Sequence, residues 1–358
     1  MEFVYFAEES IDFGLFQIRK FSIEELNTIL RNEINKVFYP WAYIDELYKL
    51  ANYWFICVTV PQYELILSHS IKIKPGAEVE IIEPIEINYT KYPKPLESIL
   101  KYLTLFRWEQ IARAGEFNFN IPLILQIKES LLSSPNNAPE LLFLETEIVE
   151  DPNTHKEFEV PIIKFYLDAS ETVQFKKFIN DIKNILDNLK IENKWRFLEI
   201  AQNYLIKAFF SEGLEQLLWH ITVIEALLGE EKQGITEYLA KRIATILGST
   251  EREKKKLRKD FKKLYDFRSA LVHGRSIKET DTTHLYYARS FARRLLLWFL
   301  HYLNAIQTGL PKDKSDEDIP EREDLLKLID LDKNSRIRMR WMIDKIPEDF
   351  PNVSEWKE

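Results

Sequence analysis

The chain has 358 residues, a net charge of −8, 46% hydrophobic and 30% charged residues, and one cysteine. This composition excludes a disordered or fibrous protein and fits two domains of ordinary size, and the lone Cys57 excludes a disulfide within the chain and indicates a reducing compartment. The negative charge disfavours a protein that coats nucleic acid over its whole surface, but a local basic patch suffices for binding.

The N-terminus, MEFVYFAEES, has acidic residues where a secretory signal peptide has basic ones. No apolar run approaches the roughly 20 residues that a transmembrane helix needs. We therefore expect a cytoplasmic protein with no membrane partner.

Residues 1–170 alternate between strand and helix patterns and predict a mixed α/β domain. Ser22 and Glu25 form a capping box, which predicts a helix from there to about residue 35. Strands are predicted over residues 1–20, 54–60, 63–72, 77–88, 118–126, 140–149 and 160–166, helices over residues 40–50 and 96–114, and an exposed hairpin loop over residues 146–159. No phosphate-binding loop, glycine fingerprint or metal-ligand spacing is found here, so the role of this domain, sensing or substrate recruitment, stays open.

Helical periodicity then predicts an all-α bundle over residues 171–310. The expected helices span residues 171–189, 192–210, 213–228, 235–247, 252–273 and 282–306. Gly229 and Gly248 follow two of them, where glycine often ends a helix. Residues 311–358 combine a charged linker, DKSDEDIPERED, with a last helix over residues 325–345. The predicted fold class is α+β, a mixed α/β N-terminal domain followed by a helical bundle.

Two opposite charges stand on otherwise apolar helix faces in this bundle. Glu225 lies near the middle of the apolar stripe of the helix over residues 213–228, and Arg268 lies likewise on the helix over residues 252–273. An isolated buried charge is costly, so we expect Glu225 within hydrogen-bond reach of Arg268 or of a cleft. Such a pair can also be a purely structural feature of the fold. His220, at the flank of the first stripe, is interpreted as a hydrogen-bonded boundary histidine.

The opposite face of the second helix is basic. It contains Lys255, Lys259 and Lys262, and residues 251–268 include nine basic and four acidic residues. A charge run is usually only a solvated helix face. Because this run leads to His273, it is also a candidate surface for a phosphate backbone.

His273 precedes Gly274 at the predicted end of this helix. A histidine can donate or accept a proton in phosphoryl chemistry near neutral pH, while Arg268 can hold a non-bridging oxygen and neutralise developing charge. Five residues along a regular helix correspond to a rotation of about 140°, so the two side chains do not share a face. Either the helix loosens near Ala270, or the site is composite and is built from two copies of the segment in a symmetric homodimer.

The residues from Arg268 to His273, RSALVH, resemble the R-x4-6-H motif of HEPN domains, helical bundles common among prokaryotic toxins and defence proteins. The polar Ser269 after the arginine fits this motif. The flanking sequences IEALLG, from residue 224, and LYDFRSALVHG, from residue 264, resemble the Apea-like branch. The resemblance covers about residues 195–305.

A second pair, Arg294 and His301, satisfies the looser spacing of the motif. The residues between them include LLLWFL, on a strongly apolar helix. We therefore interpret His301 as a core or boundary residue and not as part of a site.

The resemblance implies a metal-independent endoribonuclease that needs no cofactor and acts as a homodimer on RNA. Active HEPN domains combine arginine and histidine from two protomers, and the RNA 2′-hydroxyl attacks its own phosphate. Arg268 would then stabilise the phosphate and His273 would act as acid or base, with Glu225 and Ser269 in support. Lys255, Lys259 and Lys262 would bind the nucleic acid. A toxin or antiviral-defence role implies a regulatory or neutralising partner protein.

Two other interpretations stay open. In the first, the bundle is a non-catalytic binding or dimerisation module, Arg268 is locked to Glu225, and His273 only ends its helix. In the second, the chemistry lies in residues 1–170, where we find no nucleophile–base pair or ligand cluster. An exposed His273 in a basic cleft favours the ribonuclease, and a buried His273 favours the binding module.

Overall fold

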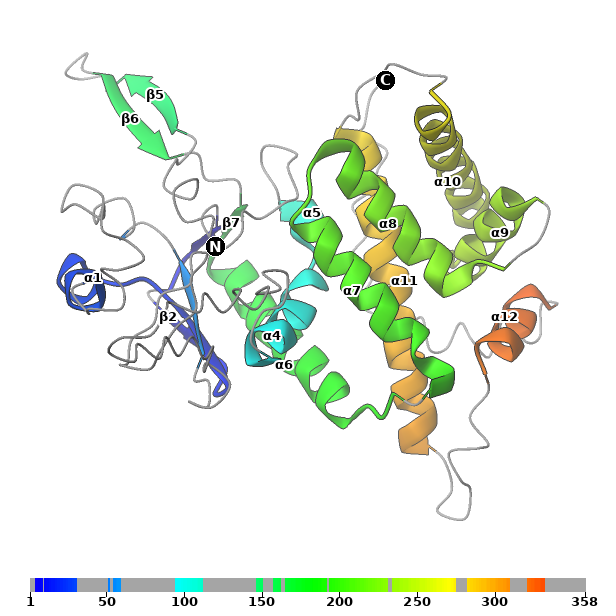
Figure 1. The fold of residues 1–358 in the computed structure, drawn as a ribbon, viewed down its shortest axis with the longest axis horizontal. Coiled ribbons are helices and arrows are strands. Elements are labelled where there is room, and N and C mark those ends of the chain that lie inside the picture. The colour runs from blue at the N-terminus through cyan, green and yellow to red at the C-terminus, as the bar shows by residue number, and fades with distance from the viewer. Residues whose placement is uncertain are drawn as a thin grey trace, which may run out of the picture. The chain divides into compact units, whose positions relative to one another are not determined.

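The computed structural model describes residues 4–8, 10–30, 51, 54–58, 94–111, 146–150, 157–161, 165–191, 193–230, 234–274, 282–309 and 321–331 (Figure 1). These residues fall into two compact units, one within residues 1–100 and 119–163 and the other within residues 101–118 and 164–358. The architecture is α+β, mostly helical with a small antiparallel sheet of three strands. Within the described part of the chain, no helix is long and apolar enough to cross a membrane. The predicted boundaries near residues 170 and 310 stay predictions.

The first unit contains β1 (Val4–Phe6) and a sheet of three short antiparallel strands, β2 (Ser10–Asp12), β3 (Phe16–Arg19) and β4 (Phe55–Val58). In this sheet Ile18 of β3 pairs with Ile11 of β2 and with Ile56 of β4. β4 confirms the strand predicted over residues 54–60.

A tight turn separates β2 from β3. Gly14 has a φ of +78°, which favours glycine, and its amide donates a hydrogen bond to Asp12 Oδ1 at 2.7 Å. The prediction of a single strand over residues 1–20 is therefore wrong. The loose alternation in this segment covers several strands and a turn.

α1 (Ile23–Leu30) begins at the predicted capping box. The Glu25 amide donates to Ser22 Oγ at 3.2 Å, and the Ser22 amide donates to the Glu25 carboxylate at 2.8 Å. These bonds satisfy amides that the first turn of a helix leaves unpaired. The predicted end near residue 35 lies outside the described residues, as do the elements expected over residues 40–50, 63–72, 77–88 and 118–126.

β5 (Thr146–Glu150) and β6 (Glu157–Pro161) pair as antiparallel strands, with Ile148 opposite Glu159. The sequence predicted a hairpin here, but with residues 146–159 as its loop. That assignment is wrong, because the strands themselves occupy both ends of this segment. In β6 the charged residues Glu157 and Glu159 alternate with Phe158 and Val160, as in a strand.

The second unit is mostly helical. Its elements are the end of α4 (Lys94–Thr104), α5 (Trp108–Ile111), β7 (Phe165–Leu167), α6 (Ala169–Asn188), the 3-10 turn η3 (Asn193–Trp195), α7 (Phe197–Phe209), α8 (Gly213–Leu228), α9 (Ile235–Leu247), α10 (Glu251–Val272), α11 (Thr282–Gly309) and α12 (Arg322–Asp330). α8 and α9 have the predicted bounds. α8 packs against α7 and α11, and α9 packs against α10 (Figure 1). Leu217, Ile221 and Ile224 of α8 are fully buried.

The helix predicted over residues 96–114 is interrupted between α4 and α5. The indole Nε1 of Trp108 donates to the Leu103 carbonyl at 2.8 Å. Nη2 of Arg289, on α11, donates to the carbonyls of Thr104 and Phe106 at 3.0 and 3.1 Å. These distant donors satisfy the carbonyls that the interruption exposes, so the predicted single helix is wrong.

Arg289 also belongs to a buried ion cluster. Glu109 of α5 accepts hydrogen bonds from Nε of Arg289 at 3.0 Å and from Nε of Arg293 at 2.8 Å. Burial would raise the pKa of Glu109, but Arg293 and Arg289 lower it below its ordinary value. The cluster fixes α5 against α11 in the core.

His220 of α8 lies in the same core. Its side chain is 0% exposed, and neither ring nitrogen has a hydrogen-bond partner among the described residues. Burial, and after it the positive charge of Arg289, lowers the pKa of His220 well below its ordinary value. The interpretation of His220 as a hydrogen-bonded boundary residue is therefore wrong, and the imidazole is a neutral core group.

Candidate functional site

α10 presents most of the predicted site residues. It begins with a capping box, in which the Glu253 amide donates to Thr250 Oγ1 at 3.2 Å and the Thr250 amide donates to the Glu253 carboxylate at 3.1 Å. The helix runs without interruption through Ala270, and the His273 amide donates to the Ser269 carbonyl at 3.1 Å. The alternative in which the helix loosens near Ala270 is therefore wrong.

His273 is the last residue before the helix ends. Gly274 follows with a φ of +64°, and its amide donates to the Leu271 carbonyl at 3.1 Å. This left-handed glycine closes the helix and turns the backbone away. The side chain of His273 is exposed, as the ribonuclease interpretation expects.

Glu225 and Arg268 face each other across the contact between α8 and α10. Arg268 Nη2 lies 3.9 Å from Glu225 Oε1, and each side chain is 27% exposed. The expected charge pair is therefore present. The distance exceeds that of a hydrogen bond, so of the two expected placements, at Arg268 or at a cleft, the first is present only as an ion pair.

Tyr265, and not Arg268, donates a hydrogen bond to Glu225. Its hydroxyl donates to the same Glu225 oxygen, Oε1, at 2.7 Å. Burial, and then this hydrogen bond, raises the pKa of Tyr265 to about 12, so the phenol stays a donor at neutral pH. Sequence analysis missed Tyr265, although its place one helical turn before Arg268 could have indicated it.

The Arg268 guanidinium makes no hydrogen bond to any residue in the described part of the chain. Its Nε is buried without an acceptor, and its Cζ lies 5.5 Å from the centre of the Tyr265 ring. The cation is thus held by a ring face and a long ion pair. Because Nε is buried, the donors that an anion from outside can meet are those on the two Nη groups of this part-exposed side chain.

His273 belongs to a different face of α10. Rotation of about 100° per residue places Lys255, Lys259, Lys262 and Ser269 within about 40° of His273, whereas Arg268 is about 140° away. The predicted lysines therefore line one stripe that leads to His273. Ser269 lies one turn before the histidine on this stripe.

The three lysines differ in their surroundings. Lys262 forms an ion pair with Glu237 of α9. The side chains of Lys255 and Lys259 are exposed and form no ion pair within the described residues. Lys255 and Lys259 are therefore the lysines of this stripe that are available to a polyanion.

One exposed apolar side chain lies close to the Glu225–Arg268 pair. Val272, one turn after Arg268, is 50% exposed. Leu214 of α8 is 41% exposed and faces the same side of α8 as Glu225, but it lies about 16 Å before Glu225 along the helix axis. The two side chains are therefore separate exposed residues and do not form one apolar patch.

The second arginine–histidine pair does not resemble a site. His301 is half-buried on α11, and burial lowers the pKa of His301. Arg294 is half-buried on the same helix. Both lie on a helix whose remaining surface is largely core, in agreement with the interpretation of His301 as a boundary residue.

In the described ranges, no group of three or more His, Cys, Asp or Glu residues could hold a metal ion. No family model, curated protein or solved structure matches the chain. The candidate site is therefore defined by geometry alone: an arginine with no hydrogen bond to the described residues beside Glu225 and Tyr265, and an exposed histidine at the end of a lysine stripe.

Proposed function

We propose that the protein is a metal-independent endoribonuclease of the HEPN type, which acts on RNA in the cytoplasm in a toxin or antiviral-defence role. The supporting observation is the state of Arg268. The guanidinium is half-buried, makes no hydrogen bond to the described residues, and keeps only a 3.9 Å contact with Glu225. An arginine in this state suits a phosphate, whose oxygens accept paired hydrogen bonds from a guanidinium.

Tyr265 explains why Arg268 stays available. Because the phenol donates to Glu225 Oε1 at 2.7 Å, it satisfies the oxygen that is nearest the guanidinium. Glu225 then offsets the charge of Arg268 without occupying its donors. A phosphate can displace this long, half-exposed ion pair at small cost.

The two catalytic candidates require a second protomer. His273 and Arg268 lie on opposite sides of an uninterrupted helix, so one chain does not direct both at one phosphate. A two-fold axis near the ends of the two α10 helices would bring His273 of one protomer toward Arg268 of the other. The exposed Val272, directly before His273, provides apolar area for such a contact.

In the proposed reaction, the RNA 2′-hydroxyl attacks the adjacent phosphorus and loses its proton to a base. The bond from phosphorus to the 5′-oxygen breaks, and that oxygen gains a proton. The products are a 2′,3′-cyclic phosphate and a 5′-hydroxyl. His273 supplies one of these proton transfers, and Arg268 neutralises charge on the non-bridging oxygens.

A second candidate is a non-catalytic module that binds RNA or dimerises, with a regulatory partner protein in either case. The pairing of Arg268 with Glu225 favours it, because a structural ion pair needs no further role. In this alternative the lysine stripe binds the phosphate backbone and His273 is a surface residue.

The test is cleavage of mixed RNA substrates in the presence of EDTA by the natural chain and by His273→Ala. A matched control is Asn203→Ala, a change of an exposed residue on α7. Cleavage by the natural chain and the control, lost in His273→Ala while RNA binding persists, supports the ribonuclease. Equal cleavage by all three contradicts the role of His273, and binding without cleavage in all three favours the second candidate.

A further inference from the structure

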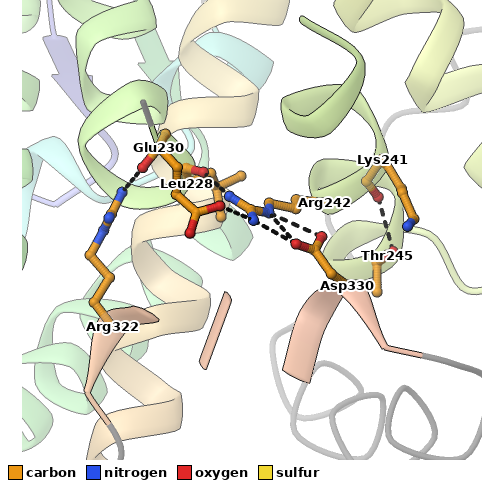
Figure 2. A network of polar contacts seen from close by, with 8 residues as sticks. Leu228, Glu230, Lys241, Arg242, Thr245, Arg322 and Asp330 are labelled. Carbon is orange, nitrogen blue, oxygen red and sulfur yellow. Dashed lines mark hydrogen bonds and ion pairs between the residues drawn. The ribbon is translucent and has the colours of Figure 1, made fainter. Parts of the chain in front are cut away.

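Two arginines donate hydrogen bonds to carbonyls at the C-terminal end of α8, the helix that contains Glu225. Arg242 Nη1, from α9, donates to the Leu228 carbonyl at 2.6 Å. Arg322, from α12, donates to the Ala226 carbonyl at 3.2 Å through Nε and to the Gly229 carbonyl at 2.5 Å through Nη2. Figure 2 shows Arg242 and Arg322 reaching this turn from two different elements.

These contacts replace the usual glycine cap. The last carbonyls of a helix lack partners, and the negative end of the helix dipole favours cations. Gly229 has a φ of −72°, so it does not form the left-handed closure that Gly274 forms. Its amide donates to the Glu225 carbonyl at 2.7 Å, and a Cβ at this position would lie 2.5 Å from that oxygen. The two guanidinium groups therefore take the place of a backbone cap.

α12 is held in place by the same network. Asp330 accepts hydrogen bonds from Arg242 Nε at 3.1 Å and from Nη2 at 2.5 Å, and Arg242 is 1% exposed. Arg242 also pairs with Glu230 at 2.5 Å (Figure 2). Three apolar residues of α12 are fully buried: Leu325, Leu326 and Ile329. Asp330 and Arg322 thus join the two ends of α12 to the corner between α8 and α9.

We infer that Arg322, together with Arg242, positions Glu225. Glu225 lies in the turn whose carbonyls the two arginines bind, and its own carbonyl accepts the Gly229 amide. The Glu225 side chain meets Tyr265 and Arg268 from that turn. α12 therefore sets how closely the carboxylate approaches the candidate phosphate-binding arginine.

The consequence for RNA cleavage depends on the proposed function, but the positioning does not. Loss of the cap loosens the last turn of α8 and weakens the hydrogen bond from Tyr265 to Glu225. If α12 stabilises the fold without positioning Glu225, loss of Arg322 lowers the stability of the protein and leaves that hydrogen bond unchanged. The two cases differ in whether Arg322 and Tyr265 are energetically coupled.

The experiment uses the full chain and the substitution Arg322→Gln, with Lys327→Gln as the matched control on α12, where Lys327 forms an ion pair with exposed Asp324. Arg242 is unsuitable, because its burial makes misfolding a separate cause of any loss. Hydrogen exchange is measured in peptides that cover Glu225 to Gly229. Thermal unfolding is measured for Arg322→Gln and Tyr265→Phe, singly and together.

Arg322→Gln is expected to accelerate exchange in these peptides about five- to tenfold, the size of a lost helix cap, and Lys327→Gln is expected to leave it unchanged. The decreases in Tm for Arg322→Gln and Tyr265→Phe should be smaller together than their sum. Additive decreases, or unchanged exchange in the peptides, overturn the inference.

A cleavage measurement separates this inference from the proposed function. If the chain cleaves RNA, Arg322→Gln should lower the rate in the natural background and have no further effect in Glu225→Gln. A further loss in the Glu225→Gln background contradicts positioning through Glu225. If no variant cleaves RNA, the proposed ribonuclease fails, and the exchange and coupling results still decide the role of Arg322.

Discussion

Tyr265 and Arg268 share one acceptor, Glu225 Oε1, which lies 2.7 Å from the phenol oxygen and 3.9 Å from the guanidinium Nη2. The phenol makes the hydrogen bond to this oxygen, and the guanidinium makes the ion pair with it. Arg268 is therefore neutralised in part while its donors stay available. This relationship is the main support for a phosphate site at Arg268.

Glu225→Gln should strengthen RNA binding. The substitution removes the negative charge beside Arg268, and a half-exposed ion pair of this kind contributes up to about 1 kcal/mol, which corresponds to about two- to fivefold in affinity. Fluorescence anisotropy with a labelled RNA measures the change, with Glu215→Gln on the same helix as control. Weaker binding by Glu225→Gln would show that the carboxylate itself supports the RNA contact.

Mixed dimers should recover activity that each variant lacks. Arg268→Ala and His273→Ala remove different halves of the proposed composite site. A heterodimer of the two retains one complete site if arginine and histidine come from different protomers, and none if they come from the same protomer. Equimolar mixing should restore about a quarter of natural cleavage, because half of the dimers are mixed and each has one intact site. Mixed samples as inactive as either parent would contradict the composite site.

The three lysines of the stripe should contribute unequally to the salt dependence of RNA binding. Lys255→Gln and Lys259→Gln should each lower the slope of log K against log salt concentration by about 0.7 to 0.9, because each removes one phosphate contact. Lys262→Gln should change it less, since Lys262 already pairs with Glu237. Titrations between low and moderate salt measure these slopes, with Lys183→Gln of α6 as control. Equal slopes for all variants would place the RNA elsewhere.

His220 should make stability depend on pH. Its pKa is depressed in the fold by burial and by Arg289, so the unfolded chain binds the extra proton below an ordinary pKa of about 6.5. The free energy of unfolding is then unaffected by His220 above that pH. Below it, protonation of His220 in the unfolded chain lowers the free energy of unfolding by up to about 1.4 kcal/mol per pH unit. Denaturant unfolding at pH 7.5 and 5.5 should show a smaller loss for His220→Leu than for the natural chain. His301 titrates in the same direction and remains in both proteins. An identical loss in both would contradict a neutral His220.

Glu109→Gln should be strongly destabilising. The carboxylate accepts hydrogen bonds from Arg289 and Arg293, and its side chain is 0% exposed. Removing its charge leaves two buried cations without a counter-ion, at a cost of about 3 to 5 kcal/mol. Denaturant unfolding measures this cost, and Glu199→Gln, at an exposed position of α7, serves as control. A loss below about 1 kcal/mol would indicate that water or an anion reaches the cluster.

The bounds of α8 and α9 and the capping box at Ser22 and Glu25 could be predicted from the sequence, because local spacing of apolar, glycine and capping residues determines them. The charge pair of Glu225 and Arg268 was also predictable from their place on apolar helix faces. In each case the relevant contacts are made within one helix or between faces that the helical period defines.

Other features depended on contacts between distant segments. The helix predicted over residues 96–114 ends early because Arg289 binds the carbonyls of Thr104 and Phe106. No local pattern indicates an arginine that is 183 or more positions away in the chain. The same holds for Arg322 at the end of α8.

The sequence by itself determined the bounds of α8 and α9 and the charges on their apolar faces, because backbone hydrogen bonds and side-chain period are local properties. Only the tertiary structure decided which polar group satisfies which buried partner. Burial makes that choice necessary, since an unpaired polar group in a low-dielectric interior is costly. For this protein, Tyr265 and not Arg268 donates the hydrogen bond to Glu225, and His273 lies on the opposite face of α10 from Arg268.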